Sequence, residues 1–302
     1  MYFSIYNLTI KSDILLLNAI TGSKTDNPDV VVKRVDNIVV DLSQMQQVGA
    51  YCWCAPDALF LSIPNVAQCH IYDGQCIDIA LTESADLGLV TAYIQGYFLA
   101  IILQQRKRMV LHGTTLQKGG QAIAICGASG MGKSTLAMAL IGQGWQLIAD
   151  DVCAFDEQGQ VVSGCFEIKI WPDVINALSL DELPVFSSGL EKRQLTFANQ
   201  ACSADEAAPS YPLAAIYCLQ TDAEQNAIDE YKGMQKFAPL KMNVYRTQFM
   251  AAMKTEIDFM KNCSAFISNI PVFKLSRDKC KLSKQGLEGL SSLVINSLQS
   301  KV

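Results

Sequence analysis

Short hydrophobic runs separated by polar turn residues occupy the first eighty positions of the chain. The runs 30–32, 38–40, 58–63 and 76–80 are rich in β-branched, aromatic or other apolar residues, and each is predicted to form a strand. Asn, Asp, Pro and Gly lie between several of these runs, as expected of turns. The sequence therefore predicts a β-rich N-terminal segment.

A longer apolar stretch follows at 87–103, and the basic run 106–108 closes it. We predict one helix over about 84–106, since cations near a helix C-terminus interact favourably with its dipole. The stretch is shorter than the ~20 residues of a typical membrane span, and the polar residues Thr91 and Gln95 interrupt it. A buried helix and no membrane span are the expectation.

Strand and helix patterns alternate from residue 109 onward. A helix predicted at 133–142 lies between strand-like runs, and this βαβ order predicts a parallel sheet covered by helices. The pattern of residues 176–212 is irregular. The remaining predicted elements are strands at 109–112, 122–126, 146–149, 213–219 and 270–275, a hairpin over 152–163, and an amphipathic helix near 287–298.

These patterns divide the chain into three expected parts. They are a β-rich N-terminal domain (1–83), a connecting helix (84–108) and an α/β domain (109–302). The N-terminal domain is predicted to be either an acceptor-recognition domain or a platform for packing and oligomerisation.

Charge and cysteine content narrow the function classes. The chain has 24 Lys and Arg against 29 Asp and Glu, a formal net charge of −5, so the basic surface of a general nucleic-acid binder is not expected. Eleven cysteines are an odd number, which favours reduced thiols and a cytoplasmic protein. A zinc set built on Cys52 and Cys54 is disfavoured, because structural zinc sites usually use C-x-x-C pairs.

The sequence Gly-Ala-Ser-Gly-Met-Gly-Lys-Ser at 127–134 matches the Walker A pattern G-x-x-x-x-G-K-[ST] completely. Its glycines let successive backbone N–H groups converge on phosphate oxygens, and the following helix adds its positive dipole end. Lys133 is predicted to contact the terminal phosphates and Ser134 to ligate Mg²⁺. The predicted nucleotide-binding residues are Gly127, Ala128, Ser129, Gly130, Met131, Gly132, Lys133, Ser134 and Thr135.

The strand predicted at 146–149 ends in Asp150 and Asp151. Ligands of open α/β sheets lie beyond the carboxyl ends of the strands, so a carboxylate there can hold Mg²⁺. Consecutive side chains of an extended chain point to opposite faces. One aspartate is therefore expected to face the metal and the other an incoming acceptor, and capping of the next turn is the alternative for one of them.

Four features together resemble the catalytic domain of HPr kinase/phosphorylase and of related HPr-kinase-like proteins. They are His112-Gly113, the loop 127–134, the helix exit 140–145 and the strand end 147–151. The resemblance implies an α/β fold: a P-loop kinase core of the HPr kinase/phosphoenolpyruvate carboxykinase type, here with a β-rich N-terminal domain. It is firm over about 108–170. The N-terminal segment does not resemble that of true HPr kinases.

The resemblance also implies roles for individual residues. By position, Asp151 is the base that takes the proton of the acceptor hydroxyl, His112 lies beside that acceptor, and Lys133 acts on the phosphoryl group. A lone histidine after apolar residues would otherwise be interpreted as structural.

Further residues complete the implied site. The implied metal ligands are Ser134, Asp150 and Glu167. Lys192 and Arg193 are the nearest basic candidates for a transition-state cation, with a solvated loop charge as the alternative.

The expected activity is ATP- and Mg²⁺-dependent phosphoryl transfer to a serine hydroxyl of a peptide or protein. Some members of the wider group phosphorylate ribosomally made precursor peptides, lasso peptides among them. Two other functions stay open, a kinase for a small-molecule hydroxyl and a nucleotide-gated regulatory P-loop NTPase. The resemblance leaves a homo-oligomer open as well.

Overall fold

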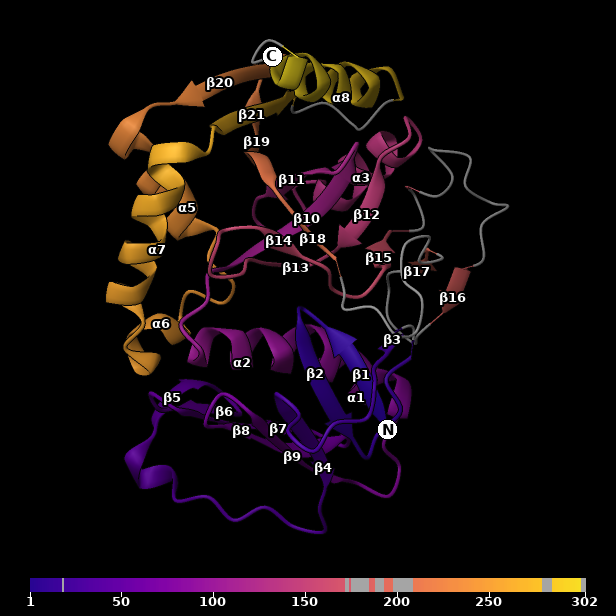
Figure 1. Ribbon diagram of the computed structural model, residues 1–302, viewed down its shortest axis with the longest axis vertical. Coiled ribbons are helices and arrows are strands. Elements are labelled where there is room, and N and C mark those ends of the chain that lie inside the picture. Colours follow the sequence, from indigo (N-terminus) through magenta and orange to yellow (C-terminus); the bar gives the residue numbers. More distant parts are fainter. Residues whose placement is uncertain are drawn as a thin grey trace.

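The computed structural model describes residues 1–17, 19–171, 174, 185–187, 193–197, 209–278 and 284–299. Two large sheets lie one beneath the other, and the helical segment 87–105 runs between them (Figure 1). The lower sheet is built from the first eighty residues and the upper sheet from residues after 109.

The N-terminal sheet has nine strands in the order β3-β1-β2-β4-β9-β8-β7-β6-β5. The strands predicted at 30–32, 58–63 and 76–80 are present, but the one predicted at 38–40 is wrong. Val39 is 89% exposed and has no strand to pair with, and an apolar run forms a strand only where it packs on neighbours. The strands are β1 Tyr2–Ile5, β2 Leu8–Ser12, β3 Ile20–Thr21, β4 Val30–Arg34, β5 Gln46–Gly49, β6 Cys52–Cys54, β7 Ala58–Ile63, β8 Ala67–Tyr72 and β9 Cys76–Leu81.

The central helical segment consists of α1 (Leu87–Ala92), a π-helical turn (Tyr93–Phe98) and α2 (Leu99–Gln105). The Asp86 side chain caps α1 by accepting the backbone N–H of Gly88 at 2.8 Å. Among the described residues, the segment Leu87–Gln105 is the one helix whose length and apolar composition would allow it to cross a membrane. Most of it is buried against the two sheets, which agrees with the predicted buried helix.

The second sheet runs in the order β12-β10-β11-β19-β21-β20, and β13 pairs with the start of β10. Among the described strands of this sheet, β11, β19 and β21 pair in parallel and the other pairs are antiparallel, so the predicted parallel sheet is instead mixed. β10 and β11 form an antiparallel hairpin, and β12 pairs with β10 antiparallel. The strands are β10 Val110–Lys118, β11 Gln121–Cys126, β12 Gln146–Ala149, β13 Val152–Ala154, β19 Leu213–Ala223, β20 Ala227–Tyr231 and β21 Val272–Asp278.

Helices cover both faces of this second sheet (Figure 1). α3 (Lys133–Ile141) and α8 (Lys284–Gln299) pack on one face, and α5 (Phe237–Met242) and α7 (Glu256–Asn269) on the other. The fold is therefore mixed α/β, as the sequence predicted at the level of class.

Short elements complete the described structure. The predicted hairpin 152–163 turns at an antiparallel bridge between Phe155 and Val161. Within the range 176–212, which was predicted to be irregular, the structure describes residues 185–187, 193–197 and 209–212, and three short strands lie among them. The rest of that range lies outside the described residues. The short elements are β14 Val161–Val162, β15 Glu167–Ile170, β16 Val185–Ser187, β17 Arg193–Thr196, β18 Ser210–Tyr211, α6 Phe249–Met253 and the 3-10 helices Leu42–Gln44 and Gly233–Lys236.

One buried cluster joins the N-terminal sheet to the rest of the molecule. It contains residues of β1, β2, β4 and β6 to β9, the helix 87–105, and Val110, Val152, Tyr245 and Phe249 from the part of the chain after residue 109. The tip of the β1–β2 hairpin also docks there, because the Tyr6 N–H donates to the Ser163 carbonyl at 2.7 Å. The N-terminal sheet, the helix 87–105 and part of the second sheet therefore share one buried core.

Gly164 permits this docking, and its replacement with Ala is expected to destabilise the protein. A Cβ at Gly164 would lie 2.5 Å from a ring carbon of Tyr6, which is 2% exposed and cannot move aside freely. We expect Gly164→Ala to lower the free energy of unfolding by about 1–3 kcal/mol, measured by urea denaturation. Gly96→Ala is the control, because nothing lies within 4 Å of a Cβ there. Equal stability of the two variants would contradict the prediction.

Candidate active site

The Walker A segment is a loop between β11, which ends at Cys126, and α3, which begins at Lys133. Gly132 precedes the helix in a left-handed conformation, with φ of 97°, which favours glycine. A Cβ on Gly127 would lie 2.9 Å from the Leu219 carbonyl oxygen of β19. The neighbouring parallel strand therefore leaves space only for glycine at the start of the loop.

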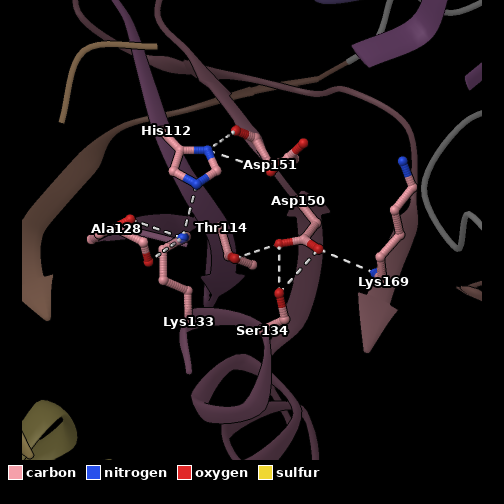
Figure 2. Close-up of polar contacts among 9 residues, drawn as sticks. His112, Thr114, Ala128, Lys133, Ser134, Asp150, Asp151 and Lys169 are labelled. Atoms are coloured by element: carbon pink, nitrogen blue, oxygen red, sulfur yellow. Dashed lines mark hydrogen bonds and ion pairs between the residues drawn. The ribbon is translucent and has the colours of Figure 1, made fainter. Parts of the chain in front are cut away.

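Lys133 is held inside this loop and is only 7% exposed. Its Nζ donates to the carbonyl oxygens of Gly127 at 2.8 Å and Ala128 at 3.2 Å, and lies 3.0 Å from His112 Nε2 (Figure 2). Three fixed contacts thus hold the ammonium group at the position where a Walker A loop receives phosphate.

Asp150 faces Ser134, the other polar residue at the start of α3. The Ser134 hydroxyl lies 3.3 and 3.2 Å from the two carboxylate oxygens, Thr114 Oγ1 donates at 2.5 Å, and the Lys169 N–H donates at 3.2 Å (Figure 2). Burial, and next the charge of Asp151, raise the pKa of Asp150, while these hydrogen bonds oppose the rise. A hydroxyl and a carboxylate this close are oxygen ligands of the kind Mg²⁺ prefers.

Asp151 points away from Asp150, toward His112 (Figure 2). Its backbone φ is 72°, so the chain turns through a left-handed residue and is not extended there. The two carboxylates still diverge, as predicted, but a backbone conformation that costs about 1–3 kcal/mol outside glycine directs the second one. Asp151 Oδ1 lies 3.4 Å from His112 Nδ1, and its side chain is 53% exposed.

His112 lies between Lys133 and Asp151 because of how β10 is paired. Its neighbour Gly113 pairs with Cys126 at the end of β11, and His112 itself pairs with Val152 of β13. When the Lys133 ammonium donates to Nε2, the imidazole proton is on Nδ1 and donates to the backbone carbonyl of Asp151 at 3.2 Å. Burial and then the Lys133 charge lower the pKa of His112, against the opposing effect of Asp151, which favours the neutral ring at pH 7.

Titration of the two histidines of the chain tests this electrostatic arrangement. In an NMR titration we expect His112 to have a pKa below 6.5, and Lys133→Met to raise that pKa because a neighbouring cation is removed. As the pH falls below about 6.5, His112 becomes protonated in the unfolded chain but stays neutral in the folded protein. This difference in bound protons lowers the free energy of unfolding as the pH falls. His70, in the N-terminal sheet, is the internal control; an unchanged His112 pKa in Lys133→Met would contradict the assignment.

His112 and Asp151 border two hollows. The larger, about 1360 Å³, is lined by the start of the Walker A loop, the C-terminal end of β19 and residues 235–248 in part. The smaller, about 140 Å³, is lined by the end of the loop, the start of α3, Asp150 and Trp171. The imidazole and the second carboxylate therefore lie where the two hollows adjoin.

The other predicted ligands and cations are placed less closely. Glu167 lies on β15, two residues before Lys169, whose N–H bonds Asp150. Lys192 lies outside the described residues, and only the backbone of Arg193 is described, in β17. In the described part of the chain, no group of three or more His, Cys, Asp or Glu side chains is placed so that it could hold a metal ion. Cys52 and Cys54 are among the described residues.

Two residues near the loop were missed by the sequence analysis. Thr114 follows His112 by two positions on β10 and contacts Asp150. The Arg277 guanidinium of β21 lies 3.6 Å from the position that a Cβ of Gly132 would take; its Nε is buried and has no hydrogen-bond partner among the described residues. Arg277 lies two residues after the predicted strand 270–275, and position near a strand end was the available signal.

A strand, a glycine loop and a helix that bring lysine and serine to a strand-end aspartate are typical of P-loop nucleotide-binding proteins. Comparison with known proteins narrows this class. Residues 104–173 match the family model of the HPr Serine kinase C-terminal domain. The chain is thus a distant relative of the HPr kinase/phosphorylases, with its similarity to the family concentrated in this segment, which confirms the resemblance seen in the sequence.

The HPr kinase/phosphorylase of Polaromonas sp. (strain JS666) is 32% identical over 128 residues, 42% of this chain and 35% of that protein. The same enzyme of Aromatoleum aromaticum is 29% identical over 132 residues, 40% and 38% of the two chains. This chain thus spans little more than a third of these curated relatives. The Hpr(Ser) kinase/phosphatase structure from Coxiella burnetii is 17% identical, with a TM-score of 0.29, over 64% of this chain and 97% of that one.

Proposed function

We propose that the protein is an ATP- and Mg²⁺-dependent kinase that transfers the γ-phosphoryl group to a serine hydroxyl of a peptide or protein. One observation carries the proposal: Asp151 and Lys133 lie on the two sides of the His112 ring, beside a complete Walker A loop. A P-loop that only hydrolyses nucleotide needs a positioned water and not this triad. The distant relation to HPr kinase/phosphorylases supports the same reaction class.

In this proposal the chain positions two substrates and moves one proton. Lys133 and the Walker A backbone bind the β- and γ-phosphates, and Asp151 accepts the proton of the acceptor hydroxyl. Neutral His112 donates from Nδ1 to the backbone carbonyl of Asp151 and so fixes the backbone from which the carboxylate extends. Mg²⁺, when bound by Ser134 and Asp150, neutralises charge on the phosphates. Most of the catalysis then comes from positioning and electrostatics, because no covalent bond to the protein forms.

The remaining expectations are part of this proposal. The core is of the HPr kinase/phosphoenolpyruvate carboxykinase type, and residues 109–302 form the catalytic domain. A cytoplasmic location is supported by the nine described cysteines, which are free thiols. The formal charge of −5 supports a peptide or protein partner over nucleic acid.

Incubation with [γ-³²P]ATP, Mg²⁺ and cell extract tests the function. We expect label in a polypeptide, acid-stable as phosphoserine is. Label confined to small molecules would instead indicate a small-molecule kinase, and free phosphate alone a regulatory NTPase. Either result contradicts the proposal.

A further inference from the structure

Residues 243–246 line the larger hollow directly beside His112. The backbone N–H of His112 donates to the Asn243 carbonyl at 2.7 Å, and the backbone N–H of Tyr245 donates to the Val110 carbonyl at 2.9 Å. An antiparallel bridge pairs Val244 with Leu111. This segment thus continues the sheet next to β10, and its backbone position is set by the strand that carries His112.

Arg246 follows this paired segment with a left-handed backbone, φ 51°. Such a conformation persists outside glycine where the surroundings impose it. Here Tyr245 is 4% exposed and its carbonyl accepts from Gln104 Nε2 at 2.5 Å, while the Arg246 carbonyl accepts from Phe249 N–H at 2.9 Å. The structure on both sides therefore fixes the direction in which Arg246 leaves the backbone.

Two aromatic rings support the Arg246 guanidinium. Its central carbon lies 5.1 Å from the ring centroid of Tyr97 and 5.9 Å from that of Tyr245, within the range of cation–π attraction. Tyr97 comes from the helical segment between the two sheets, and Tyr245 lies 6.2 Å from the His112 ring. The rings restrict the guanidinium to the wall of the hollow that His112 and Asp151 also line.

No carboxylate among the described residues lies within ion-pair distance of Arg246; the described ion pairs involve Arg106, Lys107 and His112. The Arg246 charge also contributes to the lowered pKa of His112. A guanidinium offers a fixed fork of donors that matches a carboxylate with two hydrogen bonds. Arg246 lines the larger hollow together with His112 and Asp151 and is absent from the lining of the smaller one bordered by Ser134 and Asp150. If Asp151 is the base of the proposed reaction, an acceptor hydroxyl held at Asp151 within the larger hollow shares that hollow with Arg246.

We infer that Arg246 binds an anionic group of the acceptor, so that the enzyme selects serines flanked by a carboxylate-bearing residue. This inference rests on the proposed function. It makes Arg246 a specificity-determining residue.

A degenerate library of serine-centred peptides, phosphorylated with [γ-³²P]ATP, tests the inference. For the unmodified protein we expect Asp or Glu within two positions of the serine to be favoured about five- to tenfold, a typical effect for a charge-assisted hydrogen bond at a partly exposed site. Arg246→Gln is expected to lose this preference, and Arg246→Glu to favour Lys or Arg. Lys241→Gln, which changes an exposed cation of α5, is expected to keep the preference for acidic residues.

The outcomes separate the two proposals. Peptide phosphorylation without an acidic preference, or an acidic preference that survives in Arg246→Gln, overturns the inference and leaves the kinase function standing. A loss in Arg246→Gln that is equal for every peptide and accompanied by a higher KM for ATP places Arg246 on the nucleotide and also overturns it. No label in any peptide overturns the proposed function itself. Thermal melting of each variant shows whether it is folded, and Arg246→Lys, which keeps the charge without the fork, is expected to retain a weaker acidic preference.

Discussion

Replacement of Asp151 with Asn is expected to leave nucleotide binding intact and to lower phosphoryl transfer by about 10²–10⁴-fold, the usual contribution of a general base. Asn has the same shape, and the backbone carbonyl of residue 151 can still accept from His112 Nδ1, as it does at 3.2 Å in the unmodified protein. The Asn side chain cannot accept the proton of an acceptor hydroxyl. Because the Asp151 side chain is 53% exposed, the substitution is expected to change stability little.

Two measurements on the same variant separate binding from chemistry. Affinity for a fluorescent, non-hydrolysable ATP analogue reports the Walker A loop, and single-turnover transfer from [γ-³²P]ATP reports the base. Asp26→Asn is the matched control, since Asp26 is exposed in the N-terminal segment and away from the site. Transfer at the unmodified rate in Asp151→Asn would show that the assigned base is wrong.

Replacement of Lys133 with Ala is expected to abolish ATP turnover, a loss of at least about 10²–10³-fold, as for removal of one preorganised charge-stabilising donor. The ammonium group is held by the carbonyls of Gly127 and Ala128 and lies 3.0 Å from His112 Nε2. Unlike Asp151→Asn, the variant is also expected to bind nucleotide more weakly, because the lysine contacts the phosphates before the reaction as well as during it.

Lys133→Met distinguishes loss of charge from loss of volume, since Met fills most of the same space. Lys118→Met is the matched control: Lys118 Nζ also donates to a backbone carbonyl, that of Gln143, at 2.8 Å, but at the far end of β10. Turnover is measured as release or transfer of labelled phosphate at saturating ATP. Normal turnover in Lys133→Met would exclude Lys133 from the catalytic machinery.

The phosphate-binding loop could be predicted because all of its parts are local. Its eight residues are consecutive in the sequence. The strand β11 ends immediately before them, and the helix α3 begins within them. The helix 87–105 and the strands β7 and β9 were predicted for the same reason, since an apolar periodicity over a few residues reports local structure. The run 38–40 shows the limit, because whether a short apolar run forms a strand depends on a partner.

The pairing of β10 could not be deduced from pattern alone. An alternating strand and helix order suggested a parallel sheet, but Gly119 and Gly120, both with positive φ, turn the chain into an antiparallel hairpin between β10 and β11. This hairpin returns the start of β10 to the phosphate-binding loop. It therefore explains in physical terms why His112, whose position was inferred only by resemblance, contacts Lys133.

By itself the sequence determined that this chain has a β-rich first part, a buried helix, a complete phosphate-binding loop and a strand ending in two aspartates, because each depends on neighbours along the chain. Only the tertiary structure decided that His112 lies between Lys133 and Asp151, that a left-handed Asp151 separates the two carboxylates, and that Arg246 and Arg277 reach the site. Those positions depend on contacts between residues far apart in sequence, which a local pattern of hydrophobic and polar residues does not determine.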